Sequence, residues 1–149
     1  MRKNNYINQI KFVIPSLSTN ESVARSVISA FCAQANPTAI DIADIKCAVS
    51  EAITNCIVHG YKNSVGNIYI DIKIRNDGVV RISIKDCGCG ISDIAQARQP
   101  LFTTDAENER SGMGFTVMES FMDKLSVRSV PGKGTTVVMS KRLDGIHIT

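Results

Sequence analysis

Three polar side chains that can carry chemistry recur every four residues in the first half of the chain. They are Glu51, Asn55 and His59, a carboxylate, an amide and an imidazole. On an α-helix, residues four apart are about 40° apart around the axis, so these side chains form one polar stripe. Spacing predicts a helix over residues 40–59. Its buried face carries Ile42, Ile45, Val49, Ala52, Ile53 and Cys56.

The polar stripe alone is also typical of a solvated helix face, and the sequence downstream distinguishes the two interpretations. Three glycine-bearing turns follow: D-x-G-x-G over 86–90, G-x-G over 112–114 and G-x-G-T over 132–135. Any one of them is most simply a turn between elements. Neither a P-loop nor a complete G-x-G-x-x-G is present. The order of the turns behind the polar stripe is therefore more informative than any single turn.

Together, the turns and the stripe have the parts needed to hold a nucleoside triphosphate. Asp86, at the end of a predicted strand, can accept a hydrogen bond from an exocyclic amine. Gly88 and Gly90 then let the backbone lie close to a flat base. Gly112 and Gly114, at a predicted helix start, would direct free N–H groups and the positive end of a helix dipole at phosphates.

Three further residues complete this set. Asn55 offers a neutral oxygen ligand suited to Mg²⁺, which also binds phosphate oxygens and water. Arg110, immediately before the glycines, can contact a terminal phosphate. Glu51, one helical turn before Asn55, can accept a proton from an attacking hydroxyl or water. A base, a metal ligand, a phosphate cradle and an adenine anchor are thus all present.

Composition narrows the class of protein. The 149 residues, 44% apolar and 21% charged, predict a single globular domain over 1–149. The net charge of +3 comes from scattered basic residues without aromatic interleaving, so we expect no direct binding of nucleic acid. No apolar segment has the length of a membrane span, and residues 1–5 lack a signal peptide's apolar core. The expectation is a cytoplasmic protein without a membrane partner.

The five cysteines favour a reducing compartment over a disulfide scaffold, since their number is odd. Cys32, Cys47 and Cys56 fall in helical apolar patterns and are predicted to be small core residues. Cys87 and Cys89 form a C-x-C pair, but no second Cys or His pair stands at zinc spacing. We therefore do not expect these two thiols to bind a metal.

Short elements must position the candidate residues. Alternating isoleucines predict a strand over 67–75, and Asn76-Asp77-Gly78 is a hairpin turn into an antiparallel partner over 79–86. The remaining predictions are strands over 11–14, 125–130 and 135–143, helices over about 19–35 and 93–98, and a helix opening at 112–114. We expect residues 100–110 to form an exposed loop.

The order E-x-x-x-N, D-x-G-x-G, G-x-G, G-x-G-T resembles the ATP-binding module shared by gyrase B, Hsp90, histidine kinases and MutL. Three segments are similar, more specifically, to the anti-sigma-factor serine kinases, above all their sporulation anti-sigma F branch: S-E-A-I-T-N-C-I-V-H-G-Y, A-R-Q-P-L-F-T-T and E-R-S-G-M-G-F-T-V-M-E-S-F-M-D. The resemblance covers about 20–143. It implies an α+β fold, a two-layer α/β sandwich whose mixed, mostly antiparallel sheet is covered on one face by helices (the Bergerat-type ATP-binding fold).

The resemblance also implies a function. Such a protein is a homodimer that binds and inhibits a sporulation sigma factor. With ATP and Mg²⁺ it is an ATP-dependent protein serine kinase, which phosphorylates a serine on an anti-anti-sigma partner and leaves ADP. In this chain Glu51 and Arg110 match the catalytic positions, Asn55 the magnesium ligand, and Arg25, in N-E-S-V-A-R, the contact to protein partners.

The nucleotide-binding positions follow in the same way from the resemblance. They are Asn55, His59, Asp86, Gly88, Gly90, Thr103, Thr104, Arg110, Ser111, Gly112, Gly114 and Thr135. The chain departs from the family pattern at Cys87 and Cys89, where a polar or acidic residue and an aliphatic one are more usual. Neither side chain is needed for the hydrogen bonds described above, so we expect ATP binding to survive.

Three alternatives remain open at this point. The chain can be a stress-response anti-sigma serine kinase of the same family, or a non-catalytic module that binds a sigma factor in a nucleotide-dependent way. It can also be a detached ATPase domain of a histidine kinase or type II topoisomerase. The short loop over 100–110 and the lack of a phosphoacceptor or transducer domain favour the small serine kinases over this last alternative.

Overall fold

A computed structural model describes residues 5–99 and 114–143. The elements in chain order are β1 (Tyr6–Pro15), α1 (Asn20–Cys32), the 3₁₀ turn η1 (Ala33–Ala35), α2 (Ala39–Asn55), the π-helical turn η2 (Cys56–Gly60), β2 (Asn67–Arg75), β3 (Val79–Asp86), α3 (Ile94–Ala97), α4 (Gly114–Phe121), β4 (Lys124–Val130) and β5 (Gly134–Arg142).

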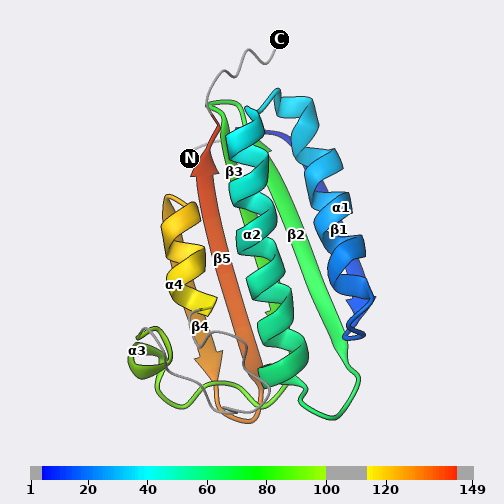
Figure 1. Ribbon diagram of the computed structural model, residues 1–149, viewed down its shortest axis with the longest axis vertical. Helices are drawn as coiled ribbons and strands as arrows, with labels where there is room; N and C mark the ends of the chain where they lie inside the picture. The colour runs from blue at the N-terminus through cyan, green and yellow to red at the C-terminus, as the bar shows by residue number, and fades with distance from the viewer. Residues whose placement is uncertain (1–4, 100–113, 144–149) are drawn as a thin grey trace.

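The described strands form one sheet in the order β1-β2-β3-β5-β4, and each of its four pairings is antiparallel. The helices α1, α2 and α4 lie side by side on one face of this sheet, with α2 in the middle (Figure 1). The predicted α+β sandwich, with a mostly antiparallel sheet and helices on one face, is therefore confirmed.

The core lies between α2 and the central strands, because side chains alternate along each strand. In β2 the four isoleucines of the alternating pattern are buried, and in β3 Val80, Ile82 and Ile84 are buried. The helices contribute Ile28 of α1, Ile45, Val49 and Ile53 of α2, and Met118 of α4. Burial of each such side chain is worth about 1.5–3 kcal/mol, so this layer holds the helices against the sheet.

Helix α2 begins at a capping box. The Thr38 hydroxyl accepts from the backbone N–H of Asp41 at 3.1 Å, and the Asp41 carboxylate accepts from the Thr38 N–H at 3.2 Å. The predicted helix of residues 40–59 is α-helical only as far as Asn55. From Cys56 it continues as η2, which the Tyr61 N–H closes on the Cys56 carbonyl at 2.9 Å. Such π turns are frequent at functional sites.

One prediction about the core is wrong. Cys32 and Cys56 are buried as expected, but Cys47 is exposed. Ile45 and Val49 face the sheet, and Cys47 lies about 200° of helical rotation from Ile45, on the opposite side of α2. Strand β1 is also longer than the predicted segment 11–14.

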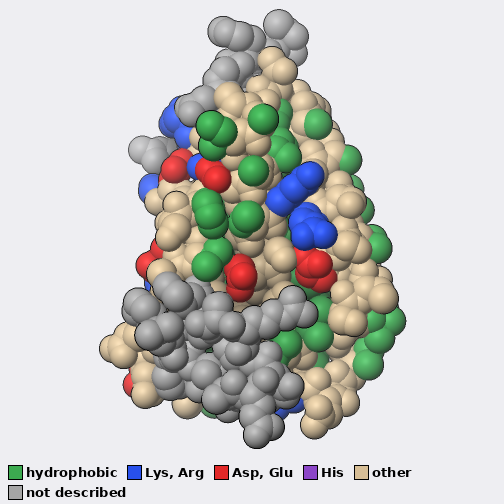
Figure 2. Space-filling view, viewed as in Figure 1, with side chains coloured by type: hydrophobic (Ala, Val, Ile, Leu, Met, Phe, Trp, Pro, Cys, Tyr) green, Lys and Arg blue, Asp and Glu red, His purple; other side chains and the backbone are tan. Residues whose placement is uncertain are grey.

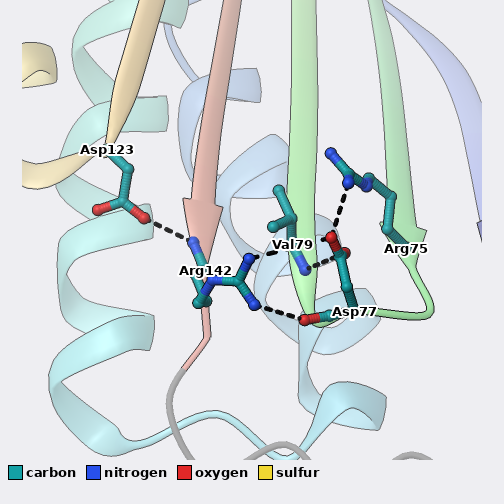
Figure 3. A network of polar contacts seen from close by, with 5 residues as sticks. All are labelled: Arg75, Asp77, Val79, Asp123 and Arg142. Carbon is teal, nitrogen blue, oxygen red and sulfur yellow. Dashed lines mark hydrogen bonds and ion pairs between the residues drawn. The ribbon is translucent and has the colours of Figure 1, made fainter.

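A polar network ties together the end of the sheet remote from Asp86 (Figure 3). The Arg142 guanidinium donates to the Asp77 carbonyl at 2.9 Å, and the Arg142 backbone N–H donates to the Asp123 carboxylate at 2.7 Å. Arg75 pairs with the Asp77 carboxylate at 2.6 Å. The β2–β3 hairpin is thereby joined to the end of β5. Within residues 5–99 and 114–143, no helix has the length and apolar character needed to cross a bilayer.

Candidate active site

A cavity of about 290 Å³ lies where the end of α2, the turn η2, and the adjacent ends of β3 and β5 meet α3 and the start of α4. Its lining brings together six residues that the sequence nominated: Asn55, His59, Asp86, Gly90, Gly114 and Thr135. The volume is at the lower end of the usual range for small-molecule sites. These six positions, distant in sequence, thus share one hollow.

Asp86 is the buried polar group of this cavity, with an exposed fraction of 3%. Burial raises the pKa of its carboxyl group above the ordinary value. Hydrogen bonds from the Gly88 N–H, the Cys56 thiol and the Thr135 N–H oppose that rise in pKa. The Gly88 N–H lies 2.9 Å from Oδ1. Asp86 is consequently an oriented acceptor in a mostly apolar recess.

Glycines allow the backbone to close around Asp86. A Cβ on Gly60 would lie 2.9 Å from the Asp86 carboxyl carbon, and one on Gly134 would lie 2.1 Å from the Asp86 carbonyl oxygen. A Cβ on Gly88 would lie 2.1 Å from the Gly60 carbonyl oxygen. Gly88 is not among the described residues that line the cavity, and its close neighbour is the Gly60 backbone, so its nucleotide-binding role stays a prediction.

The loop after Asp86 is held on both sides by backbone hydrogen bonds. The Cys89 N–H donates to the Gly60 carbonyl at 2.9 Å, and the Gly132 N–H donates to the Cys89 carbonyl at 2.7 Å. The Tyr61 hydroxyl accepts from the Cys87 N–H at 2.7 Å. These contacts fix the D-x-G-x-G segment against η2 and the β4–β5 turn.

Thr135 is positioned by strand pairing and by a serine. It lies opposite Asp86 in the register of β5 and β3. The Ser129 hydroxyl lies 3.0 Å from the Thr135 hydroxyl and accepts from the Ile91 N–H at 2.6 Å. Two of the glycine-bearing turns, over 86–90 and 132–135, are therefore joined at the cavity by a shared hydrogen-bond network.

Asn55 lies against the first residue of α4. A Cβ on Gly114 would be 3.1 Å from both Nδ2 and Oδ1 of Asn55. An amide oxygen beside a helix N-terminus is a suitable place for a phosphate-bound cation, because the helix start favours the anion and the amide favours the metal. No cluster of three His, Cys, Asp or Glu side chains able to hold a metal occurs in the described part of the chain.

Glu51 does not line this cavity. It lines a second hollow, of about 460 Å³, with Arg25 and Ser26 of α1, Lys46, Cys47 and Ser50 of α2, and Val117 and Phe121 of α4. The polar stripe therefore opens onto two different spaces, although Glu51 and Asn55 are one helical turn apart. The Arg25 guanidinium also pairs with Glu21 at 3.4 Å. On this face, basic and acidic side chains gather over α1 and α2 (Figure 2).

Five nominated residues lie outside the described residues: Thr103, Thr104, Arg110, Ser111 and Gly112. Their assignments stay predictions from the sequence.

The cavity also contains residues that the sequence did not nominate. Cys56 hydrogen-bonds with Asp86, and burial together with that carboxylate raises the pKa of the Cys56 thiol well above its ordinary value. Ile91 and Phe115 provide apolar walls, and Lys62 places a cation at the rim. Ile91 and Phe115 directly follow nominated glycines, and this adjacency is a signal that could have identified them.

Comparison with known proteins agrees with this geometry. Residues 14–141 match the family model described as histidine kinase-like ATPase domain. An anti-sigma F factor of Thermoanaerobacter sp. (strain X514) is 56% identical, over 91% of this chain and 94% of that protein. An anti-sigma F factor of Bacillus subtilis (strain 168) is 50% identical, over 91% of this chain and 93% of that protein.

Among solved structures, the crystal structure of the RsbU and RsbW domains of Rv1364c from Mycobacterium tuberculosis has the same fold. The TM-score is 0.66 at 22% identity, over 91% of this chain and 32% of that chain. The sequence relatives and the family model each extend over most of the chain, across both the polar helix and the glycine-bearing turns. The chain belongs to the anti-sigma F factor family, within the histidine kinase-like ATPase domains.

Proposed function

We propose that this protein binds and inhibits a sporulation sigma factor and uses Mg-ATP to phosphorylate a serine on an anti-anti-sigma partner. The observation that carries the proposal is the convergence of Asn55, Asp86, Gly114 and Thr135 on one cavity. Membership of the anti-sigma F factor family supplies the partner class.

The adenine end of the nucleotide belongs at Asp86. Its carboxylate is a buried acceptor within an apolar recess, a combination that suits a flat base with an exocyclic amine. The walls formed by Ile91, Phe115 and Val137 are suited to the faces of such a base. The glycines beside Asp86 keep the backbone out of the space that the base needs.

The phosphate end belongs beside Asn55 and the start of α4. Magnesium usually keeps several water ligands and takes only one or two ligands from the protein. One amide oxygen, without a cluster of carboxylates in the described residues, therefore fits this metal. Bound there, Mg²⁺ would neutralise charge on the phosphates during transfer. Arg110 is proposed to contact the γ-phosphate, and Thr103, Thr104, Ser111 and Gly112 to complete the nucleotide contacts.

The acceptor serine is proposed to enter from the hollow that contains Glu51. Glu51 would take the hydroxyl proton as the serine oxygen bonds to the γ-phosphorus. The bond between the γ-phosphorus and the β,γ-bridging oxygen would break, and ADP would leave with that oxygen. Arg25 lines the same hollow, which places the candidate partner contact and the candidate base on one surface. We further propose a cytoplasmic homodimer organised as one domain over 1–149.

Incubation with radiolabelled ATP, Mg²⁺ and a purified anti-anti-sigma protein tests the kinase activity, with phosphoserine identified by mass spectrometry. Phosphoserine should form with Mg²⁺ and not after chelation. Sigma-factor binding is measured separately by calorimetry in the presence of nucleotide. Absence of phosphoserine from a sample that binds ATP would overturn the kinase assignment and leave the sigma-binding assignment to be decided by calorimetry.

One observation favours a second candidate function, a non-catalytic module that holds nucleotide as a structural ligand. Glu51 lies outside the lining of the nucleotide cavity. A catalytic base must lie within hydrogen-bond distance of the acceptor hydroxyl. For Glu51 to meet this requirement, the residues around the two hollows would have to move closer together. Phosphoserine formation by the wild-type protein would exclude this second candidate.

A further inference from the structure

The second face of the sheet carries a concentration of positive charge. No described helix covers this face, since α1, α2 and α4 all pack on the other (Figure 1). We call it the open face and define it by the strand residues that alternate with the buried ones. Its ionised side chains are eight cations and one carboxylate: Lys11, Lys73, Arg75, Arg81, Lys85, Lys124, Arg128, Arg142 and Asp71.

Strand register arranges five of these cations in two rows across the sheet. In one row Lys73 lies opposite Arg81, Arg81 opposite Ser140, and Ser140 opposite Lys124. The other row carries Lys85 and Arg128 on either side of Thr136. Neighbouring residues on one face of a strand are about 7 Å apart, so the two rows, four residues apart, are separated by roughly 13 Å.

The row between these two contains a short neutral stretch. It runs from Ser83 through Val138 to Ser126. Lys11 and Asp71 stand at its β1 end, where the Asp71 carboxylate accepts a hydrogen bond from Gln9 at 2.8 Å. The open face therefore presents two cationic rows on either side of a narrow uncharged strip.

Charge is thereby segregated between the faces of the protein. The whole chain has 17 basic and 14 acidic residues. Removal of the eight cations and one carboxylate of the open face leaves 9 basic and 13 acidic residues, a net charge of −4, for the rest. The open face alone has a net charge of +7. The small net charge of the whole chain is thus the sum of a strongly positive open face and a negatively charged remainder.

Six of the eight cations of the open face are not neutralised within the described residues. Arg75 and Arg142 pair with Asp77, and none of the other six forms an ion pair there. Lys73 lies over the ring of Tyr6, at 4.9 Å from its centroid, and Lys85 lies 6.0 Å from the Tyr69 centroid. Like charges directly opposite each other in a sheet are destabilising, so the Lys73–Arg81 pair opposes folding. Such an arrangement favours the binding of an external anion.

We propose that the open face is a docking surface for an acidic segment of a partner protein. Complementary charge favours this occupant, and the exposed Val13 and Tyr69 on the same face suit the apolar contacts of a protein interface. A second copy is disfavoured, because two faces of +7 would repel each other. Single-stranded nucleic acid is disfavoured because lysines already occupy the faces of Tyr6 and Tyr69, which bases would need for stacking.

This surface lies on the opposite side of the sheet from the nucleotide cavity, which is built where helices meet the sheet ends. The inference therefore goes beyond the proposed kinase and sigma-binding function and does not depend on it. Binding at the open face should be compatible with a nucleotide in the cavity.

The test uses fluorescently labelled poly-L-glutamate, with affinity measured by anisotropy at low and high salt. The Arg81→Glu/Lys85→Glu variant removes one cation from each row, and we expect it to bind about tenfold or more weakly than wild type. The matched control, Lys46→Glu/Arg98→Glu, changes the charge equally on the helical side and should bind within about twofold of wild type. Saturating ATP should not displace the probe.

The variant should remain folded, since Arg81→Glu creates an opposite-charge pair with Lys73. Circular dichroism and nucleotide binding establish this directly. Equal weakening in both double variants, or displacement of the probe by ATP, would overturn the proposal. Tighter binding of oligo-dT or of phosphatidylglycerol vesicles at this face would overturn the choice of occupant. A change in dimerisation on Arg81→Glu/Lys85→Glu, measured by sedimentation, would instead identify a contact between copies.

Discussion

The Cys56 thiol and the Asp86 carboxylate hydrogen-bond to each other across the junction of η2 and β3. Burial and this carboxylate raise the pKa of Cys56, and burial raises the pKa of Asp86 despite the donors around it. The carboxylate is therefore oriented by neighbours and, at the same time, costly to keep ionised. This combination is expected where a binding group is held ready for a ligand.

Asp86→Asn should weaken binding of ATP and ADP about 10- to 100-fold, because the anchoring acceptor of the cavity loses its charge. Isothermal titration calorimetry measures this loss. In the absence of nucleotide, the same variant should melt at a higher temperature than wild type, since it no longer buries an ionisable carboxyl group. A lower melting temperature without nucleotide would contradict the assignment of burial as the cause of the raised pKa.

The stability difference between Asp86→Asn and wild type should depend on pH. Because the folded pKa of Asp86 lies above its ordinary value of 3.8, this group stabilises the fold most below that pH. Its contribution is lost as the pH rises through the folded pKa. The free energy of unfolding of the variant, relative to wild type, should therefore increase from pH 3.8 upward and then level off. Urea denaturation at a series of pH values measures it, and a flat difference would contradict it.

Glu51→Gln should keep nucleotide affinity within about twofold and lower the rate of phosphoryl transfer at least about 100-fold, the usual contribution of a general base. The separation is expected because Glu51 lies outside the nucleotide cavity. Radiolabel transfer and calorimetry on the same sample give the two quantities. Ser50→Ala, a neighbouring change in the same hollow, is the control for disturbance of α2. Transfer at the wild-type rate would remove Glu51 from the catalytic role.

Gly88→Ala should lower the free energy of unfolding by about 1–3 kcal/mol and abolish tight nucleotide binding, since the new methyl group would meet the Gly60 backbone. Gly132→Ala is the matched comparison. Among the described residues, no atom other than those of its chain neighbours lies within 4 Å of the added Cβ, so its φ of +78° is the unfavourable factor there, at about 1–2 kcal/mol. Urea denaturation and calorimetry distinguish the two variants. Nucleotide affinity reduced equally in both would show that the close approach to Gly60 is unimportant.

Asp77→Ala should cost about 1 kcal/mol of stability and leave nucleotide affinity unchanged. It removes the carboxylate acceptor for Arg75 and for the Val79 N–H, both at the end of the sheet remote from the cavity (Figure 3). Chemical denaturation and calorimetry check the pair of outcomes. A loss of nucleotide affinity would mean that strain travels the length of β3 to Asp86.

The regular elements were predictable because their signals are local. Alternating isoleucines and the Asn76-Asp77-Gly78 turn predicted β2 and β3 at the bounds that the structure has. The change from α2 to η2 was not predictable, because the apolar pattern continues through Cys56. That change accompanies contacts with distant residues, including the Gly60 carbonyl accepting from Cys89.

The residues of the candidate site were predictable from the sequence, but which of the two hollows each of them lines was not. Six of the residues that the order of the motifs predicted for the site line one cavity. The order of the motifs could not reveal that Glu51 lines a different hollow, since that depends on how Val117 and Phe121 of α4 approach α2. The open face was equally hidden, because its cations are spaced along strands whose neighbours become known only from the sheet order.

The division of the polar stripe between two hollows has a pharmacological consequence. A small molecule that fills the space lined by Asn55 would compete with nucleotide but leave the surface around Arg25 and Glu51 accessible to protein. A ligand wedged between α1 and α4 would do the reverse. Under the proposed function either ligand would stop phosphoryl transfer, the first by excluding nucleotide and the second by covering Glu51, and only the second would also cover Arg25.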